Sequence, residues 1–139
     1  MAGYSQTPLA KKLGIKAGHR VLIANAPPRF SATLGELPDG ASLATRSGKK
    51  PYDVVVAFFT TVRDLEHRFA TLAKHLVPAG GLWIAWPKKA ARMQTDLDEK
   101  HVRRIGLASG LVDNKVCAID EIWSGLRFVI RLRDRPAPG

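Results

Sequence analysis

DVVVAFFTTVRDLEHRFATLAKHLVPAGGLWIAW, residues 53–86, is the stretch that decides the fold. It opens with an unbroken apolar run at 54–59 and closes with another at 82–86. Runs without polar alternation are typical of parallel strands that are covered on both faces. Between the two runs, apolar residues recur at steps of three and four, which predicts a helix with one face on the sheet. These helical residues are Val62, Leu65, Phe69, Leu72 and Leu76, and Pro78 and Gly80-Gly81 are expected to end the helix. The residues expected in the core are Val54, Val56, Phe58, Leu65, Phe69, Leu72, Leu82, Ile84 and Val116.

The flanking segments extend this strand–helix–strand unit into one domain. The apolar run at 21–24 predicts another buried strand, which ends at the prolines 27–28 because proline cannot continue a central strand. The other predicted elements are helices at 8–13 and 95–109 and strands at 42–46, 115–120 and 126–132. Alternating strands and helices imply a sheet with helices on both faces. We predict a single Rossmann-like, three-layer α/β domain over residues 1–139, with a mostly parallel sheet closed by a C-terminal antiparallel hairpin and a flexible end at about 134–139.

Composition and charge narrow the class of protein. Cys117 is the single cysteine, so an intramolecular disulfide is excluded. The longest apolar runs are far shorter than the roughly 20 residues that a membrane-spanning helix needs. No export signal is visible at the start of the chain, so we expect a cytoplasmic protein without a membrane partner. The formal net charge of +10 indicates either a solubilising surface or an anionic partner.

Several segments resemble known families. LGIKAGHRVLIANAP at 13–27 and the strand–helix–Gly-Gly–strand pattern of 53–86 resemble class I methyltransferases, and the final hairpin is similar to the antiparallel end of that fold. GGLWIAWPKKA at 80–90 and GLVDNKVCAIDEIWSGLRFV at 110–129 resemble a family of short bacterial proteins that has no assigned activity. The resemblance implies a methyltransferase-like, Rossmann-like fold and supplies no reaction.

The motifs that methyltransferases use to bind S-adenosylmethionine (SAM) are absent. The Gly-rich turn that follows the first strand in this family reads Asn25-Ala-Pro-Pro-Arg29 here. The acidic residue that holds the ribose after the second strand is replaced by Ala44-Thr-Arg46. The polar-Pro-Pro-aromatic motif of amino methyltransferases is missing where Thr60 and Thr61 stand. The sequence therefore predicts that no cofactor is bound.

Ligands of open α/β sheets gather beyond the carboxyl ends of the strands. In this chain that edge carries hydroxyl groups at a helix N-terminus, lysines suited to phosphate, and a tryptophan suited to stacking on a base. The predicted anion-binding residues are Asn25, Arg46, Thr60, Thr61, Trp86, Lys88 and Lys89. The alternative is a solvated basic loop beside a core tryptophan.

Other candidate groups have simpler structural explanations. Asp113 and the pair Asp120-Glu121 flank one predicted strand and could transfer protons, but Asp113-Asn114 is more simply a turn. Trp123 either forms a recognition loop or packs over the sheet edge, and we expect the packing. The four histidines are scattered, so we expect them on the surface. The sequence predicts no catalytic and no metal-binding residue.

The sequence favours a non-catalytic, basic binding or regulatory module on a degenerate methyltransferase-like fold. Its partner would be an anionic small molecule, a nucleotide or a nucleic acid. Two alternatives stay open. One is a small methyltransferase-like enzyme that acts on an anionic substrate. The other is a structural protein that works through a partner chain.

Overall fold

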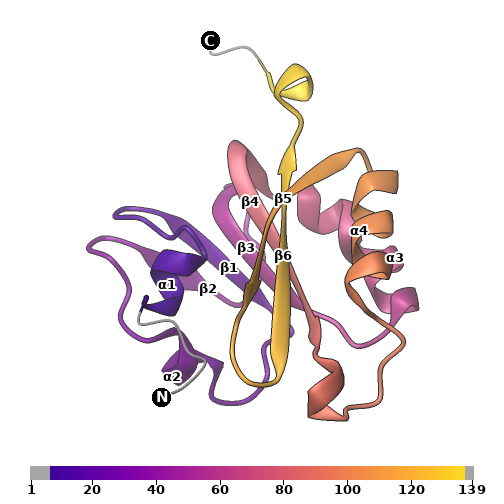
Figure 1. The fold of residues 1–139 in the computed structure, drawn as a ribbon. Helices are drawn as coiled ribbons and strands as arrows, with labels where there is room; N and C mark the ends of the chain where they lie inside the picture. The colour runs from indigo at the N-terminus through magenta and orange to yellow at the C-terminus, as the bar shows by residue number, and fades with distance from the viewer. Residues whose placement is uncertain (1–6, 137–139) are drawn as a thin grey trace.

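The computed structural model describes residues 7–136 of the chain. Its centre is a six-stranded sheet with the strand order β2-β1-β3-β4-β6-β5 (Figure 1). The strands are β1 (Arg20–Ala24), β2 (Ser42–Ala44), β3 (Tyr52–Phe58), β4 (Leu76–Pro87), β5 (Leu111–Ala118) and β6 (Trp123–Ile130). The first four strands pair in parallel, whereas β6 runs antiparallel to both β4 and β5. The predicted α/β domain with a closing antiparallel hairpin is confirmed.

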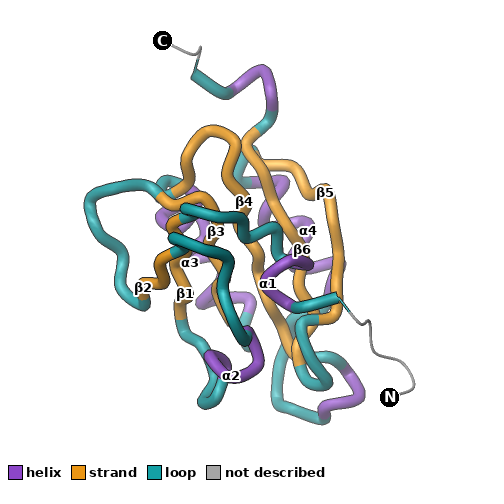
Figure 2. The backbone as a smooth tube through the Cα atoms, turned by 90° about the vertical axis from the view of Figure 1, so that its left-hand side faces the viewer, coloured by secondary structure: helices purple, strands orange, loops and turns teal. Residues whose placement is uncertain are grey.

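Helices cover both faces of the sheet, which gives the predicted three layers. Helices α1 (Leu9–Lys12) and α2 (Phe30–Leu34) lie on one face, and α3 (Val62–Ala73) and α4 (Glu99–Ala108) lie on the other (Figure 2). Short 3₁₀ helices follow β4 at Lys89–Ala91 and β6 at Leu132–Asp134. Part of the predicted flexible end, residues 137–139, lies outside the described residues. Within the described chain, no helix is long and apolar enough to cross a membrane.

Strand β3 lies at the centre of the core because its side chains are buried on both faces of the sheet. Val55 and Ala57 belong to the cluster under α3 and α4, and Val54 and Val56 belong to the cluster under α1 and α2. This two-sided burial explains the unbroken apolar run of the sequence. The predicted core residues that are at most 3% exposed are Val54, Val56, Phe58, Leu65, Phe69, Leu72, Leu82 and Ile84.

The junction between α3 and β4 differs from the sequence prediction. The helix ends at Ala73, and residues 76–81 already pair with the start of β3 across a register shift. A Cβ atom at Gly80 would lie 3.0–3.1 Å from backbone carbonyl oxygens of β3 and β4. Glycine in a strand often marks such a close approach of two backbones. The Gly80-Gly81 pair therefore belongs to the strand and does not end the helix.

Strand β5 also begins earlier than predicted. It includes Asp113 and Asn114, at a register shift against β6, so these residues do not form a turn. Val116 is 52% exposed, although the sequence prediction placed it in the core. β5 is the outermost strand, and Cys117 packs against the cluster on the α1 side. Neighbouring residues of a strand point to opposite faces, so Val116 points away from that cluster and is left open to solvent.

Trp123 opens β6 and does not lie in the predicted loop at 121–125. It is opposite Pro87 in the ladder and is 6% exposed. Its ring meets Phe58 edge to face, with 5.1 Å between the ring centroids. The expected packing of Trp123 onto the sheet is confirmed, and the connecting loop is shorter than predicted.

Helix α4 begins at Glu99, later than the predicted residue 95, because Asp98 caps it. The Asp98 carboxylate accepts a hydrogen bond from the backbone N–H of His101 at 2.9 Å. This is the ordinary role of aspartate at a helix start. The segment before Asp98 is consequently a loop, which is free to contact the carboxyl edge of the sheet.

Candidate functional site

The turn after β1 is the first part of the candidate site. Asn25 and Arg29, at its two ends, have φ angles of 57° and 70°. Glycine adopts this left-handed region freely and asparagine tolerates it, whereas a long side chain is strained there. The turn thus keeps the backbone conformation of a glycine-rich turn at both ends while carrying no glycine.

Arg68 of α3 ties this turn to the end of β3. Its Nη1 donates to Asn25 Oδ1 at 3.2 Å, and Asn25 Nδ2 donates to the carbonyl oxygen of Phe58 at 3.3 Å. A hollow of about 440 Å³ lies beside these groups, and Thr60 and Trp123 also line it. The structure therefore brings together two of the predicted site residues, Asn25 and Thr60.

The N-terminus of α3 already holds an anionic group of the chain itself. Thr61 caps the helix, since its Oγ1 accepts from the N–H of Asp64 at 3.1 Å. The N–H of Val62 donates to Asp96 Oδ1 at 2.7 Å. The carbonyl oxygen of Thr60 accepts from Thr95 Oγ1 at 2.6 Å. A phosphate at this helix end would have to displace the Asp96 carboxylate.

The other predicted residues at the end of β4 lie apart from this hollow. Trp86 is 5% exposed and packs in the core cluster under α3 and α4, so its ring is covered. Lys88 is half-buried, and its backbone N–H donates to Ile122 at 2.7 Å. Lys89 is exposed at the start of the 3₁₀ helix. Neither lysine lines the hollow beside Asn25.

Arg46, the remaining predicted residue, lines a second hollow at the same edge of the sheet. This hollow has a volume of about 270 Å³ and lies between the end of β2 and α3. Arg68 reaches it as well, so one arginine borders both hollows. The polar side chains that line it are Thr45, Arg46, Ser47, Arg68, Thr71 and His75. No carboxylate is among the described residues that line it.

Sequence reasoning missed Arg68, the residue that joins the two hollows. A signal for it exists, because Asp64, Arg68, Thr71 and His75 recur at steps of four, three and four. This spacing places them along one side of the helical stretch, next to the apolar stripe that packs on the sheet. In the structure, Arg68, Thr71 and His75 of this stripe line the hollow between β2 and α3.

The acidic candidates serve structural roles. Asp113 Oδ2 accepts from Arg103 Nε at 3.0 Å, and Arg103 also pairs with Glu99 at 2.8 Å. Asp120 Oδ1 accepts from two successive backbone N–H groups, those of Ile122 and Trp123, at 2.8 Å each. Within residues 7–136, no group of three His, Cys, Asp or Glu side chains is placed to hold a metal ion.

The surroundings of Cys117 disfavour its reactive form, and His101 is paired with the carboxylate that caps α4. Burial raises the pKa of the Cys117 thiol, an effect that Lys12 and Lys115 partly offset. His101 Nδ1 lies 2.7 Å from Asp98 Oδ1, and hydrogen bonds from His101 lower the pKa of that carboxyl. The thiolate form that a nucleophilic cysteine needs is therefore disfavoured.

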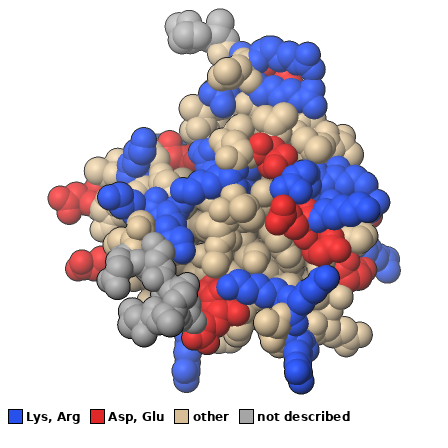
Figure 3. All heavy atoms as spheres, in the orientation of Figure 1, with Lys and Arg blue, Asp and Glu red and all other residues tan. Residues whose placement is uncertain are grey.

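The positive charge is distributed over the surface. Figure 3 shows Lys and Arg side chains in several separate groups on one face, with Asp and Glu side chains among them. The basic composition is therefore not gathered into one continuous patch on this face. The candidate binding sites are the local hollows at the carboxyl edge of the sheet.

Comparison with known proteins identifies the fold. No family model and no curated protein matches the chain. A SAM-dependent methyltransferase from Aquifex aeolicus has a TM-score of 0.59 at 18% identity, with 88% of each chain covered. Magnesium protoporphyrin IX methyltransferase from Synechocystis PCC 6803, solved with bound SAM, has a TM-score of 0.56 at 10% identity, covering 88% of this chain and 74% of that one.

A TehB-like SAM-dependent methyltransferase from Corynebacterium glutamicum has a TM-score of 0.54 at 10% identity, covering 94% of this chain and 91% of its own. At these identities the likeness concerns the fold alone. The chain has a methyltransferase-like Rossmann fold, as the first resemblance implied. The resemblance to a family of short bacterial proteins stays a prediction.

Proposed function

We propose that this protein binds a phosphate-bearing small molecule at the carboxyl edge of its sheet and does not transfer methyl groups. The observation that carries the proposal is the hollow between β2 and α3. Two arginines, Arg46 and Arg68, border it together with hydroxyl side chains, and its described lining contains no carboxylate. Such a lining attracts an anion and offers it hydrogen-bond donors.

The positive charge of Arg46, which follows β2, favours a phosphate group over ribose hydroxyls as the bound group. In dinucleotide-binding Rossmann folds, an acidic residue after the second strand binds ribose hydroxyls, whereas an arginine accommodates a phosphate at that position. β2 ends at Ala44, and Arg46 comes two residues later. Arg68 lines the same hollow from α3. Guanidinium groups bind phosphate through paired, charge-assisted hydrogen bonds, so two of them favour a phosphate group strongly.

The turn after β1 argues against a methyl-transfer cofactor. Pro27 and Pro28 have no N–H to donate, and Arg29 places a long side chain where a glycine would let a ligand approach the backbone. The Asn25 amide is already engaged by Arg68 and Phe58. These features support a role in binding without catalysis.

A second candidate function is methyl transfer. Two observations favour it: the fold likeness extends over most of the chain, and Asn25 and Arg29 keep left-handed backbone next to a hollow of about 440 Å³. A SAM molecule bound there would lie beside the Asn25–Arg68 hydrogen bond. The two candidates therefore differ in a measurable property, the affinity for SAM.

Isothermal titration tests the proposal with pyrophosphate, ADP, SAM and the demethylated product of SAM as probes. We expect saturable binding of pyrophosphate and ADP and none of SAM or its product. Arg46→Gln and Arg68→Gln should each weaken ADP binding about tenfold, the size of one charge-assisted contact. The matched control is Arg63→Gln, an exposed arginine of the same helix that lines neither hollow. Micromolar SAM binding, or equal ADP affinities in all three variants, would contradict the proposal.

A further inference from the structure

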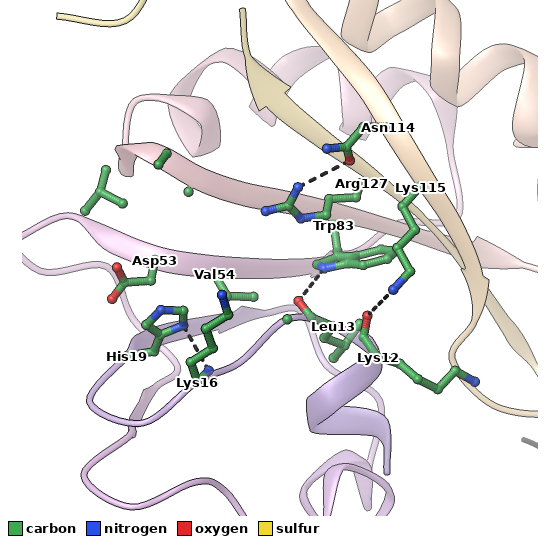
Figure 4. Close-up of a pocket in the computed structure, with 14 residues that line it drawn as sticks. Lys12, Leu13, Lys16, His19, Asp53, Val54, Trp83, Asn114, Lys115 and Arg127 are labelled. Atoms are coloured by element: carbon green, nitrogen blue, oxygen red, sulfur yellow. Dashed lines mark hydrogen bonds between the residues drawn. The ribbon is translucent and has the colours of Figure 1, made fainter. Parts of the chain in front are cut away.

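A separate hollow of about 460 Å³ lies at the opposite, amino edge of the parallel strands (Figure 4). The loop after α1, the starts of β3 and β4, and the β5–β6 pair form its walls. It shares no lining residue with the two hollows at the carboxyl edge. A ligand of this hollow would therefore contact none of the residues that line the site proposed above.

Arg127 of β6 is the central charged residue of this hollow. Its guanidinium lies directly on the backbone of Gly81, where a Cβ atom would collide with Nε. Arg127 Nη1 donates a hydrogen bond to the side-chain oxygen Oδ1 of Asn114 at 3.3 Å. None of the four ion pairs among the described residues involves Arg127.

The half-buried guanidinium thus lacks a carboxylate partner within the described chain. Burial lowers the pKa of Arg127, and the positive charge of Arg135 lowers it further. A charge that is withdrawn from water without a counter-ion is costly to the fold. A bound anion would remove this cost.

Three lysines add to the positive charge of the hollow. Lys12 Nζ donates to the carbonyl oxygen of Ala118 at 3.0 Å, and Lys115 Nζ donates to that of Lys12 at 3.2 Å, so these two lysines hold α1 against β5. Lys16 is exposed, and Figure 4 shows its side chain rising from the loop below toward the space that Arg127 bounds from above. Lys16 is therefore the cation best placed to join Arg127 at a ligand.

The rest of the lining is mostly apolar, with a single carboxylate. Trp83 lies beneath the hollow, fixed by a hydrogen bond from its Nε1 to the carbonyl oxygen of Leu13 at 3.0 Å. Val54, Val77 and Ala79 also border the space. Asp53 is the one acidic residue of the described lining, and its Oδ2 accepts from the N–H of Arg20 at 2.8 Å.

We propose that this amino-edge hollow binds a compact phosphate monoester, with its phosphate between Arg127 and Lys16 and its organic part against the apolar wall. Four cations, Lys12, Lys16, Lys115 and Arg127, face one carboxylate across the lining, which favours a dianion over a singly charged carboxylate. The volume suits a small molecule and not a polymer.

This inference can be tested by NMR titration of the ¹⁵N-labelled protein. The probes are inorganic phosphate, phenyl phosphate and acetate. Chloride at equal ionic strength is the reference. Saturable shifts are expected at the Trp83 indole N–H, the Gly80 and Gly81 amides and Arg127 Nε–H. Phenyl phosphate should bind tightest, and acetate weakest. Arg127→Met should weaken phenyl phosphate binding at least about tenfold and Lys16→Met several-fold. Lys11→Met, an exposed lysine outside the lining, is the control and should change nothing.

The Lys16→Met variant keeps the test decisive if Arg127→Met does not fold, because Lys16 is exposed and its loss removes no core contact. The inference would be overturned if chloride caused the same chemical-shift changes as phenyl phosphate. It would also be overturned if Lys16→Met bound phenyl phosphate as tightly as the wild-type protein. The amides of Thr45 and Ser47 report on the carboxyl-edge hollow in the same spectra. Either site can therefore fail while the other is retained.

Discussion

Gly106 of α4 lies against the ring of Phe128 in β6, and replacing it with alanine sets two effects of opposite sign against each other. Alanine favours a helix over glycine by about 1 kcal/mol. However, a Cβ atom at Gly106 would overlap the ring carbons Cε1, Cζ and Cδ1 of Phe128. The ring cannot easily move away, because it is fully buried and meets Phe69 edge to face at 5.2 Å.

Overpacking of a core costs about 1–3 kcal/mol, and this severe overlap lies toward the upper end. We therefore expect Gly106→Ala to lower the free energy of unfolding by about 1–2 kcal/mol after the helical gain is subtracted. Urea denaturation followed by circular dichroism measures this change. The matched background is Phe128→Leu, which removes the ring atoms that the new methyl group would meet.

In the Phe128→Leu background, Gly106→Ala should become neutral or stabilising by up to about 1 kcal/mol, because only the helical preference remains. A stabilising effect of Gly106→Ala in the wild-type chain would refute the close packing of α4 on β6. Equal effects in both backgrounds would refute the assignment of the cost to Phe128.

Three further predictions follow from individual contacts. Asp98 caps α4, so Asp98→Ala should lower the free energy of unfolding by about 1 kcal/mol at pH 7. Hydrogen bonds from His101 lower the pKa of Asp98, so this difference should shrink as the pH falls through the lowered folded pKa, which urea denaturation at neutral and acid pH would reveal. Burial raises the pKa of the Cys117 thiol, so iodoacetamide should modify this thiol more slowly at pH 8 in the folded protein than in urea. Equal rates of modification would argue against the burial of Cys117. Lys88 and Lys89 line none of the three hollows described above, so replacing them with alanine should weaken heparin binding and flatten its salt dependence no more than replacing the exposed pair Lys49 and Lys50; a larger loss would show that the loop after β4 is itself an anion site.

The central strands of the fold could be predicted because burial on both faces leaves a direct trace in the sequence. The runs at 54–59 and 82–86 contain no polar residue, and the structure places them side by side in the core. The outer strand β5 carries no such trace. Its successive polar residues Asp113, Asn114 and Lys115 resembled a turn, because their partners Arg103, Arg127 and Lys12 are brought to them only by the fold.

The candidate sites were harder to predict because they depend on contacts between distant segments. Asn25 and Thr60 could be placed at one edge, since parallel strands bring their carboxyl ends together. The amino-edge hollow has no local signal of this kind. Lys12, which lines the hollow, donates to the carbonyl oxygen of Ala118, a residue 106 positions away in the chain. Gly81 seemed a helix stop because only the fold shows Arg127 lying over it.

A crystal structure of the protein soaked with equal concentrations of ADP and SAM tests the central claim most directly. We expect ADP with a phosphate group between Arg46 and Arg68, the Asn25–Arg68 hydrogen bond intact, and no SAM at the turn after β1. SAM bound along residues 25–29 would contradict it and would favour the methyl-transfer alternative.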